Sequence, residues 1–182
     1  MPETENRCLD TFPEWLRTLA GDALALGEIV GDPTLPEPAR RYAVIGLNYL
    51  FKSLDLIPDG IEDLGFLDDA FVLRVASALA LGEAADAAAR APALVRLGEQ
   101  SGLIAELLGD DYRRLEAYVR GLRRSVARGR AVDDILADEQ LRREFLNEVS
   151  GWSKSYEPPS FTRDEKNLVK LRSFLSAKLP AL

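Results

Sequence analysis

The sequence contains no histidine among its 182 residues. Histidine is the side chain best suited to general base catalysis at neutral pH, and it is the commonest metal ligand. Its absence therefore excludes Ser-His-Asp and Cys-His nucleophile systems and almost every zinc hydrolase site. Any catalysis would have to use carboxylates, lysine or tyrosine. Any metal ion would be a hard cation held by oxygen ligands.

Cysteine and long apolar runs are also scarce. Cys8 is the single cysteine, so no internal disulfide can form and the chain fits a reducing compartment. We interpret Cys8 as a surface thiol without a function. The longest nearly apolar run, residues 70–81, contains Arg74 and is shorter than the roughly 20 residues that span a membrane. The polar, acidic N-terminus lacks the features of a signal peptide, so we expect a cytoplasmic protein or one bound peripherally to a membrane.

Strand signals are missing as well, because no segment sustains an alternation of apolar and polar residues. Helix signals are abundant, and both Thr11-Phe-Pro-Glu14 and Thr162-Arg-Asp-Glu165 have the spacing of a capping box. The sequence predicts an all-α fold, a helical bundle of about six to seven helices around a buried central helix. The predicted helices cover residues 13–29, 38–50, 68–89, 92–108, 110–128, 132–149 (with an interruption near Asp138) and 163–179.

The segment 68–89 is predicted to be the central helix, because its first half is apolar nearly all round. A buried Arg74 would need an anionic partner, and the nearest carboxylates precede it in the sequence. We divide the chain into a helical core at residues 12–90 and a helical extension at residues 91–182. The last helix of the extension follows a linker rich in proline and aromatic residues. The aromatic residues either pin the linker to the bundle, or the linker and the last helix form an arm that docks on a partner.

An acid-rich stretch, YLFKSLDLIPDGIEDLGFLDDAF at residues 49–71, carries six carboxylates among leucine, isoleucine and phenylalanine. Its pattern of Tyr49, Asp55-Leu-Ile-Pro-Asp59 and Leu64-Gly-Phe-Leu-Asp-Asp69 resembles the signature of the YkvA-like family of small bacterial domains of unknown function. The resemblance implies an α-helical core and no particular activity. The residues of this structural motif are Tyr49, Asp55, Pro58, Asp59, Gly65, Asp68, Asp69 and Arg74.

The acids of this motif have two interpretations, and the first is a metal site. Asp55, Asp59, Asp68 and Asp69 would converge as the loop folds back on the following helix. They would then bind Mg²⁺, Mn²⁺ or Ca²⁺, which prefer carboxylate oxygens. A bound cation could activate a water molecule.

The second interpretation is structural, and it is the commoner role of acids at helix starts. Asp68 and Asp69 would lie in the first turn of a helix, capping N–H groups and facing the positive end of the helix dipole. Asp55 and Asp59 would cap the turns around Pro58 or pair with an arginine. The candidate arginines are Arg40, Arg41 and Arg74.

A basic segment follows further along the chain. Seven arginines and a single acid, Glu116, lie between residues 113 and 130, which gives a local charge of +6 in a chain of net charge −7. The predicted helix over 110–128 would be basic and amphipathic, which suits a protein partner or an anionic lipid surface. The candidate contact residues are Arg113, Arg120, Arg123, Arg124 and Arg128. In the alternative interpretation the arginines form a solvated face and pair with neighbouring acids, such as Asp133, Asp134 and Glu139.

These features lead to two functional hypotheses of different classes. The leading one is a non-enzymatic helical interaction module that needs no cofactor and reaches a protein partner or an anionic membrane surface through the basic helix. The other is a metal-dependent hydrolase with an all-carboxylate site for Mg²⁺, Mn²⁺ or Ca²⁺. The acidic net charge and the few aromatic residues in the basic segment argue against nucleic acid as a partner.

Overall fold

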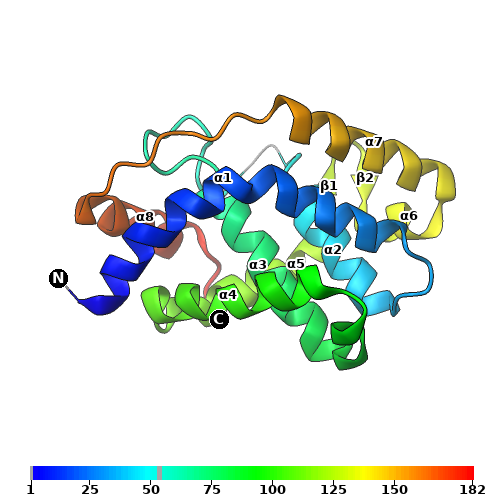
Figure 1. Ribbon diagram of the computed structural model, residues 1–182, viewed down its shortest axis with the longest axis horizontal. Coiled ribbons are helices and arrows are strands. Elements are labelled where there is room, and N and C mark those ends of the chain that lie inside the picture. Colours follow the sequence, from blue (N-terminus) through cyan, green and yellow to red (C-terminus); the bar gives the residue numbers. More distant parts are fainter. Residues whose placement is uncertain (1, 53–54) are drawn as a thin grey trace.

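The computed structural model describes residues 2–52 and 55–182. These residues form eight α-helices, two short 3-10 helices and one two-stranded hairpin (Figure 1), which confirms the all-α prediction. The elements are α1 (Glu3–Gly31), α2 (Glu37–Tyr49), α3 (Leu67–Glu83), η1 (Ala85–Ala89), α4 (Pro92–Leu108), α5 (Asp111–Gly121), η2 (Leu122–Arg124), β1 (Val126–Ala127), β2 (Arg130–Ala131), α6 (Val132–Ala137), α7 (Glu139–Ser155) and α8 (Glu165–Lys178).

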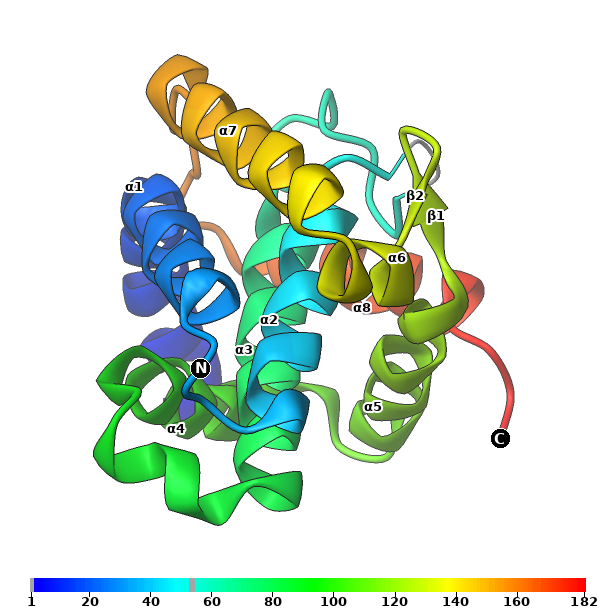
Figure 2. The same cartoon turned by 90° about the vertical axis from the view of Figure 1, so that its right-hand side faces the viewer.

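Helix α3 lies at the centre of the bundle and packs against α1, α2, α4 and α5 (Figure 2). Its residues from Leu67 to Ser77 are all buried, as the apolar sequence predicts. Two glycines allow its neighbours to approach closely. A Cβ on Gly46 of α2 would come within 2.9 Å of Leu73, and one on Gly98 of α4 within 3.3 Å of the Ala78 backbone. Gly98 therefore serves helix packing and does not break α4.

Helix α1 begins at Glu3 and not near Pro13, so the prediction that Thr11 caps this helix is wrong. The extra turns form because Cys8 and Phe12 continue the apolar face of the helix and are fully buried. Cys8 is thus not a surface thiol, and burial raises the pKa of its thiol to about 11.

Helices α7 and α8 cover the two ends of α1 (Figure 1). The predicted break at Asp138 is confirmed: its side chain accepts hydrogen bonds from the backbone N–H groups of Gln140 and Leu141 and starts α7. Helix α7 continues to Ser155, so the predicted linker is shorter. Asp164, not Thr162, accepts the capping hydrogen bond at the start of α8.

The basic segment is not one helix, and the prediction of a helix over 110–128 is wrong in its second half. Helix α5 ends at Gly121, and η2 leads into the β1–β2 hairpin. Arg128 and Gly129 have φ values of 50° and 77° in the hairpin turn. Two consecutive residues with positive φ are typical of a type I′ turn, whose twist matches paired strands.

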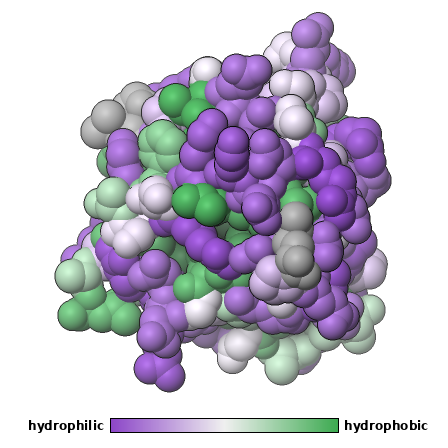
Figure 3. Space-filling model, turned by 90° about the vertical axis from the view of Figure 1, so that its left-hand side faces the viewer, coloured by the Kyte–Doolittle hydropathy of each residue, from purple (hydrophilic) through white to green (hydrophobic). Residues whose placement is uncertain are grey.

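No helix in the described chain is long and apolar enough to cross a membrane. The surface at the α8 end of the molecule is predominantly hydrophilic (Figure 3).

Candidate functional site

The acids of the motif meet where the loop after α2 returns to the start of α3. Asp68 and Asp69 occupy the first turn of α3 and are buried, whereas Asp59 lies in the loop and is exposed. One carboxylate oxygen from each of the three lies within 4.8 Å of the others. The predicted convergence is therefore present for Asp59, Asp68 and Asp69, which we call the acid cluster.

Among the described residues, hydrogen bonds reach only one oxygen of Asp68. Its Oδ2 accepts hydrogen bonds from the Tyr49 hydroxyl at 2.6 Å and from the Ile57 backbone N–H at 3.3 Å. The Tyr49 hydroxyl in turn accepts a hydrogen bond from the Leu56 backbone N–H at 2.8 Å. Tyr49 thereby fixes the loop against α3 and orients Asp68.

Other oxygens at this place are buried without a hydrogen-bond partner in the described chain: Oδ1 of Asp68, Oδ2 of Asp69 and Oδ1 of Asp55. Buried polar atoms are nearly always hydrogen-bonded, and each exception needs an explanation. The N-cap residue of α3 is Phe66, with φ of 67°, and its side chain makes no capping hydrogen bond. Asp68 and Asp69 lie in the first turn of α3, as the structural interpretation predicts, but no hydrogen bond reaches Oδ1 of Asp68 or Oδ2 of Asp69 within the described residues.

Burial sets the protonation of the site. Burial raises the pKa of Asp68 to about 6. Burial also raises the pKa of Asp55 to about 7, and the negative charges of Asp68 and Asp59 add to this rise. The pKa of the fully enclosed Asp69 is raised well above its usual value by the same burial and by the neighbouring acids. A cation bound nearby would favour the ionised form of these carboxyls.

The loop is shaped by a tight turn and a glycine. The Ile61 N–H donates to the Pro58 carbonyl at 3.1 Å, which closes the turn predicted around Pro58. A Cβ on Gly65 would lie 2.2 Å from the Asp59 carbonyl oxygen, so no other residue fits there without movement. This close approach places Asp59 beside the start of α3.

Aromatic side chains from the C-terminal part of the chain pack on the same loop. Phe66 makes edge contacts with Tyr156 at 5.2 Å between ring centroids and a tilted contact with Trp152 at 6.4 Å. The Tyr156 hydroxyl donates to the Leu16 carbonyl at 2.7 Å. The Thr162 N–H donates to the Asp63 carboxylate at 2.8 Å. These contacts support the interpretation that aromatic residues pin the linker to the bundle.

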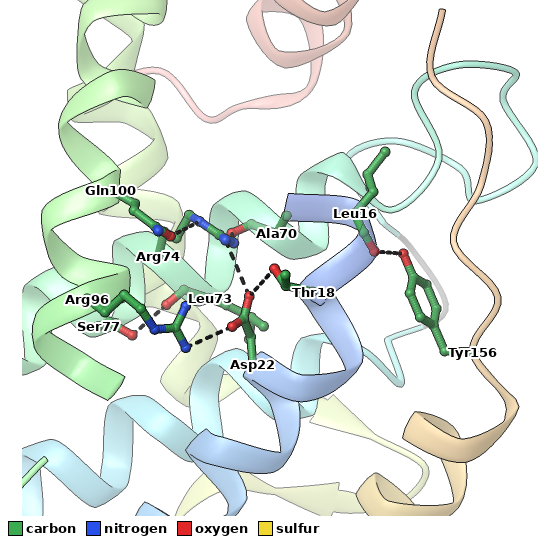
Figure 4. Close-up of polar contacts among 10 residues, drawn as sticks. All are labelled: Leu16, Thr18, Asp22, Ala70, Leu73, Arg74, Ser77, Arg96, Gln100 and Tyr156. Atoms are coloured by element: carbon green, nitrogen blue, oxygen red, sulfur yellow. Dashed lines mark hydrogen bonds and ion pairs between the residues drawn. The ribbon is translucent and has the colours of Figure 1, made fainter. Parts of the chain in front are cut away.

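Arg74 is buried, but its partners are not the motif acids, so that prediction is wrong (Figure 4). It contacts the Asp22 carboxylate at 3.3 Å and the Gln100 amide oxygen at 2.9 Å, and its guanidinium lies 4.1 Å from the Trp15 ring centroid. Asp22 also pairs with Arg96 at 2.9 Å. No local signal in the sequence points to Asp22, because it lies on α1, far from Arg74 along the chain. Arg40 and Arg41 do not reach the acid cluster either, since Arg40 bonds the Val30 carbonyl and Arg41 pairs with Glu37 and Glu83.

Several arginines of the basic segment are held by the protein itself. Arg114 donates to the carbonyls of Ser176 and Pro180 at 3.0 Å each, near the end of α8. Arg123 pairs with Asp133 at 3.3 Å, as one interpretation of the sequence proposed. Glu148 of α7 accepts from both arginines that flank Gly129 in the hairpin. The three that remain are exposed and have no polar partner within the described ranges: Arg113, Arg120 and Arg124.

One comparison with known proteins gives a match. Residues 39–74 match a family model described as "Protein of unknown function (DUF1232)". No curated protein and no solved structure matches the chain. The matched segment covers most of α2, the acid-rich loop and the first half of α3, and it therefore includes Tyr49 and the whole acid cluster. Over this segment, which is less than half of the chain, the protein is similar to a domain of unknown function.

Proposed function

We propose that the protein binds a hard divalent cation through Asp59, Asp68 and Asp69. The observation that carries this proposal is that one oxygen of Asp68 and one of Asp69 are buried and have no hydrogen-bond partner among the described residues, while both acids belong to a group of three converging carboxylates. Burying an ionised carboxylate without a partner is costly. A bound cation satisfies the free oxygens and neutralises the charge in one step.

The geometry suits Mg²⁺, Mn²⁺ or Ca²⁺. All candidate ligands are carboxylate oxygens, which these ions prefer, and no histidine or nearby thiol would favour a softer metal. Asp59 is exposed and marks the side from which an ion enters. On this side the ion can keep water ligands, as Mg²⁺ commonly does. Asp55 lies close enough to add to the negative charge of the site.

A titration with Mn²⁺, followed by the electron paramagnetic resonance signal of the free ion, tests this proposal. We expect one ion bound per chain in the wild type and loss of binding in Asp69→Asn, which removes one negative charge at nearly constant shape. Glu62→Gln is the matched control, because Glu62 is an exposed acid of the same loop that lies outside the cluster. Equal binding by the wild type and Asp69→Asn would refute the site.

The hydrolase hypothesis adds one requirement to cation binding, namely a metal-bound water that attacks a substrate. The solvent-facing Asp59 side is the place where such a water would be bound. Hydrolysis of p-nitrophenyl phosphate by Mn²⁺-loaded protein, with Asp69→Asn as the control, tests this hypothesis separately from binding.

We propose a second function, docking on an anionic membrane surface, which the three exposed arginines of α5 and η2 support. Arg113 and Arg120 lie two turns apart on α5 and have no acidic partner in the part of the chain that the structure describes. Flotation with vesicles of phosphatidylcholine and phosphatidylglycerol tests this role. The variant with Arg113→Glu and Arg120→Glu should lose binding at low salt, because each arginine near an anionic surface contributes about 1 kcal/mol.

The control for this experiment changes the same number of charges elsewhere. Arg17 and Arg143 are exposed and pair within their own helices, with Glu14 and Glu139. Replacing both by glutamate should leave vesicle binding nearly unchanged. Equal losses in the two double variants would show that net charge alone matters and would refute docking through α5.

A further inference from the structure

A groove with two cationic side chains lies next to the acid cluster, on the face of α5. Lys52, at the end of the α2 segment, and Arg124 of η2 both line it. Its wall includes Tyr118 and Ser125, and the small residues Ala117 and Gly121 leave it open. The groove has a volume of about 370 Å³, large enough for a small ligand. It differs from the acid cluster in its charge and in its lining residues.

We infer that this groove binds a phosphate group. Lys52 and Arg124 supply two positive charges, which match a phosphate dianion, and neither has a carboxylate within ion-pair distance in the described chain. An arginine fork can hold two phosphate oxygens and a lysine acts as a point charge. Ser125 adds a hydroxyl group that can donate a hydrogen bond to a remaining oxygen.

The surroundings of the groove favour an anion. Arg113 and Arg120 are exposed on the same helix and raise the positive potential along the approach, which is unusual in a chain of net charge −7.

Contacts inside the wall join the groove to the acid cluster. The Tyr118 ring lies edge-on to Tyr49 at 6.3 Å between centroids, and Tyr49 holds Asp68. Lys52 is close enough to Asp55 to oppose the rise in the pKa of that carboxyl. The inference does not depend on cation binding, because no residue that lines the groove belongs to the acid cluster.

The same chemistry could come from a soluble phosphate monoester or from the headgroup of phosphatidic acid, and two arms of one experiment separate them. In the first, isothermal titration calorimetry measures binding of inorganic phosphate and of glycerol 3-phosphate in metal-free buffer. In the second, flotation compares vesicles that contain phosphatidic acid with vesicles of equal charge that contain phosphatidylglycerol. Metal-free buffer keeps the outcome independent of the proposed cation site.

We expect saturable binding in at least one arm, and a loss of about tenfold or more in affinity in each of Lys52→Ala and Arg124→Ala, since each removes a charged hydrogen-bond donor. Arg143→Ala is the control, and circular dichroism confirms that all variants fold. Saturation by the soluble ligands alone identifies a phosphate monoester, and a preference for phosphatidic acid alone identifies a lipid headgroup. No saturable binding in either arm, or equal affinities for the wild type and both groove variants, would overturn the inference.

Discussion

The strongest quantitative prediction concerns the substitution of Asp68 by asparagine. Asparagine can place its carbonyl oxygen where Oδ2 accepts from Tyr49 and Ile57, so the two hydrogen bonds at 2.6 Å and 3.3 Å can be kept. What changes is the charge. Burial raises the pKa of Asp68 from 3.8 to about 6 in the folded protein, so the folded state binds the proton more tightly than the unfolded state.

The direction and size of the pH effect follow from this difference. Without a cation, ionised Asp68 destabilises the fold above pH 6, and the penalty fades as the pH falls through 6 and is absent below 3.8. A change in pKa from 3.8 to about 6 corresponds to on the order of 3 kcal/mol. The free energy of unfolding of the wild type, relative to Asp68→Asn, should therefore fall by about this amount between about pH 4 and pH 8.

Urea unfolding in metal-free buffer across this pH range measures the difference directly. Adding Mn²⁺ at pH 8 should restore the stability of the wild type, because a ligand at 100 times its dissociation constant contributes about 2.7 kcal/mol, and it should not stabilise the variant. If the free energies of unfolding of the two proteins changed in parallel with pH, Asp68 would not be a buried carboxylate whose ionisation destabilises the fold. An equal gain from Mn²⁺ in both would refute the cation site.

Three further predictions test the surrounding structure. Asp22→Asn should destabilise the protein by about 3–5 kcal/mol in urea unfolding, because it leaves Arg74 buried without its ion pair. Arg96→Gln, at the exposed end of the same network, should cost less than about 1 kcal/mol. Equal losses of stability in the two variants would contradict this distinction. Gly65→Ala should lower the free energy of unfolding by about 1–3 kcal/mol and weaken Mn²⁺ binding, since the new Cβ would lie 2.2 Å from a backbone carbonyl oxygen. Unchanged binding and stability would show that the loop can move to accommodate the Cβ. Cys8 should not react with Ellman's reagent until the protein unfolds, because the thiol is fully buried, and fast reaction in native buffer would contradict its placement.

The sequence was a reliable guide where local signals agree with packing. Helix α4 has the predicted bounds, Pro92 to Leu108, because a proline at its first position and Gly109 after its end mark both limits. The uniformly apolar start of α3 identified the buried centre of the bundle. The sequence predicted that four acids converge as the loop folds back on α3, and the structure brings together three of them, Asp59, Asp68 and Asp69.

Local signals misled where burial outweighed them. Pro13 has the position expected for a helix start, yet α1 continues through it because Cys8 and Phe12 extend the buried face. The basic segment kept a helical pattern beyond Gly121, but the chain turns into a hairpin at Arg128 and Gly129. Propensity and periodicity act over a few residues, and tertiary packing can override both.

The sequence by itself determined the all-α class, the central buried helix, the exclusion of histidine-based chemistry and the presence of acids that can meet at the start of α3. Only the tertiary structure decided that Arg74 pairs with Asp22, that oxygens of Asp68 and Asp69 have no partner among the described residues, and that Lys52 and Arg124 line one groove. The physical reason is that these outcomes depend on contacts between segments far apart in the chain. Periodicity indicates which face of a helix is buried, but it contains no information about the partner that covers that face.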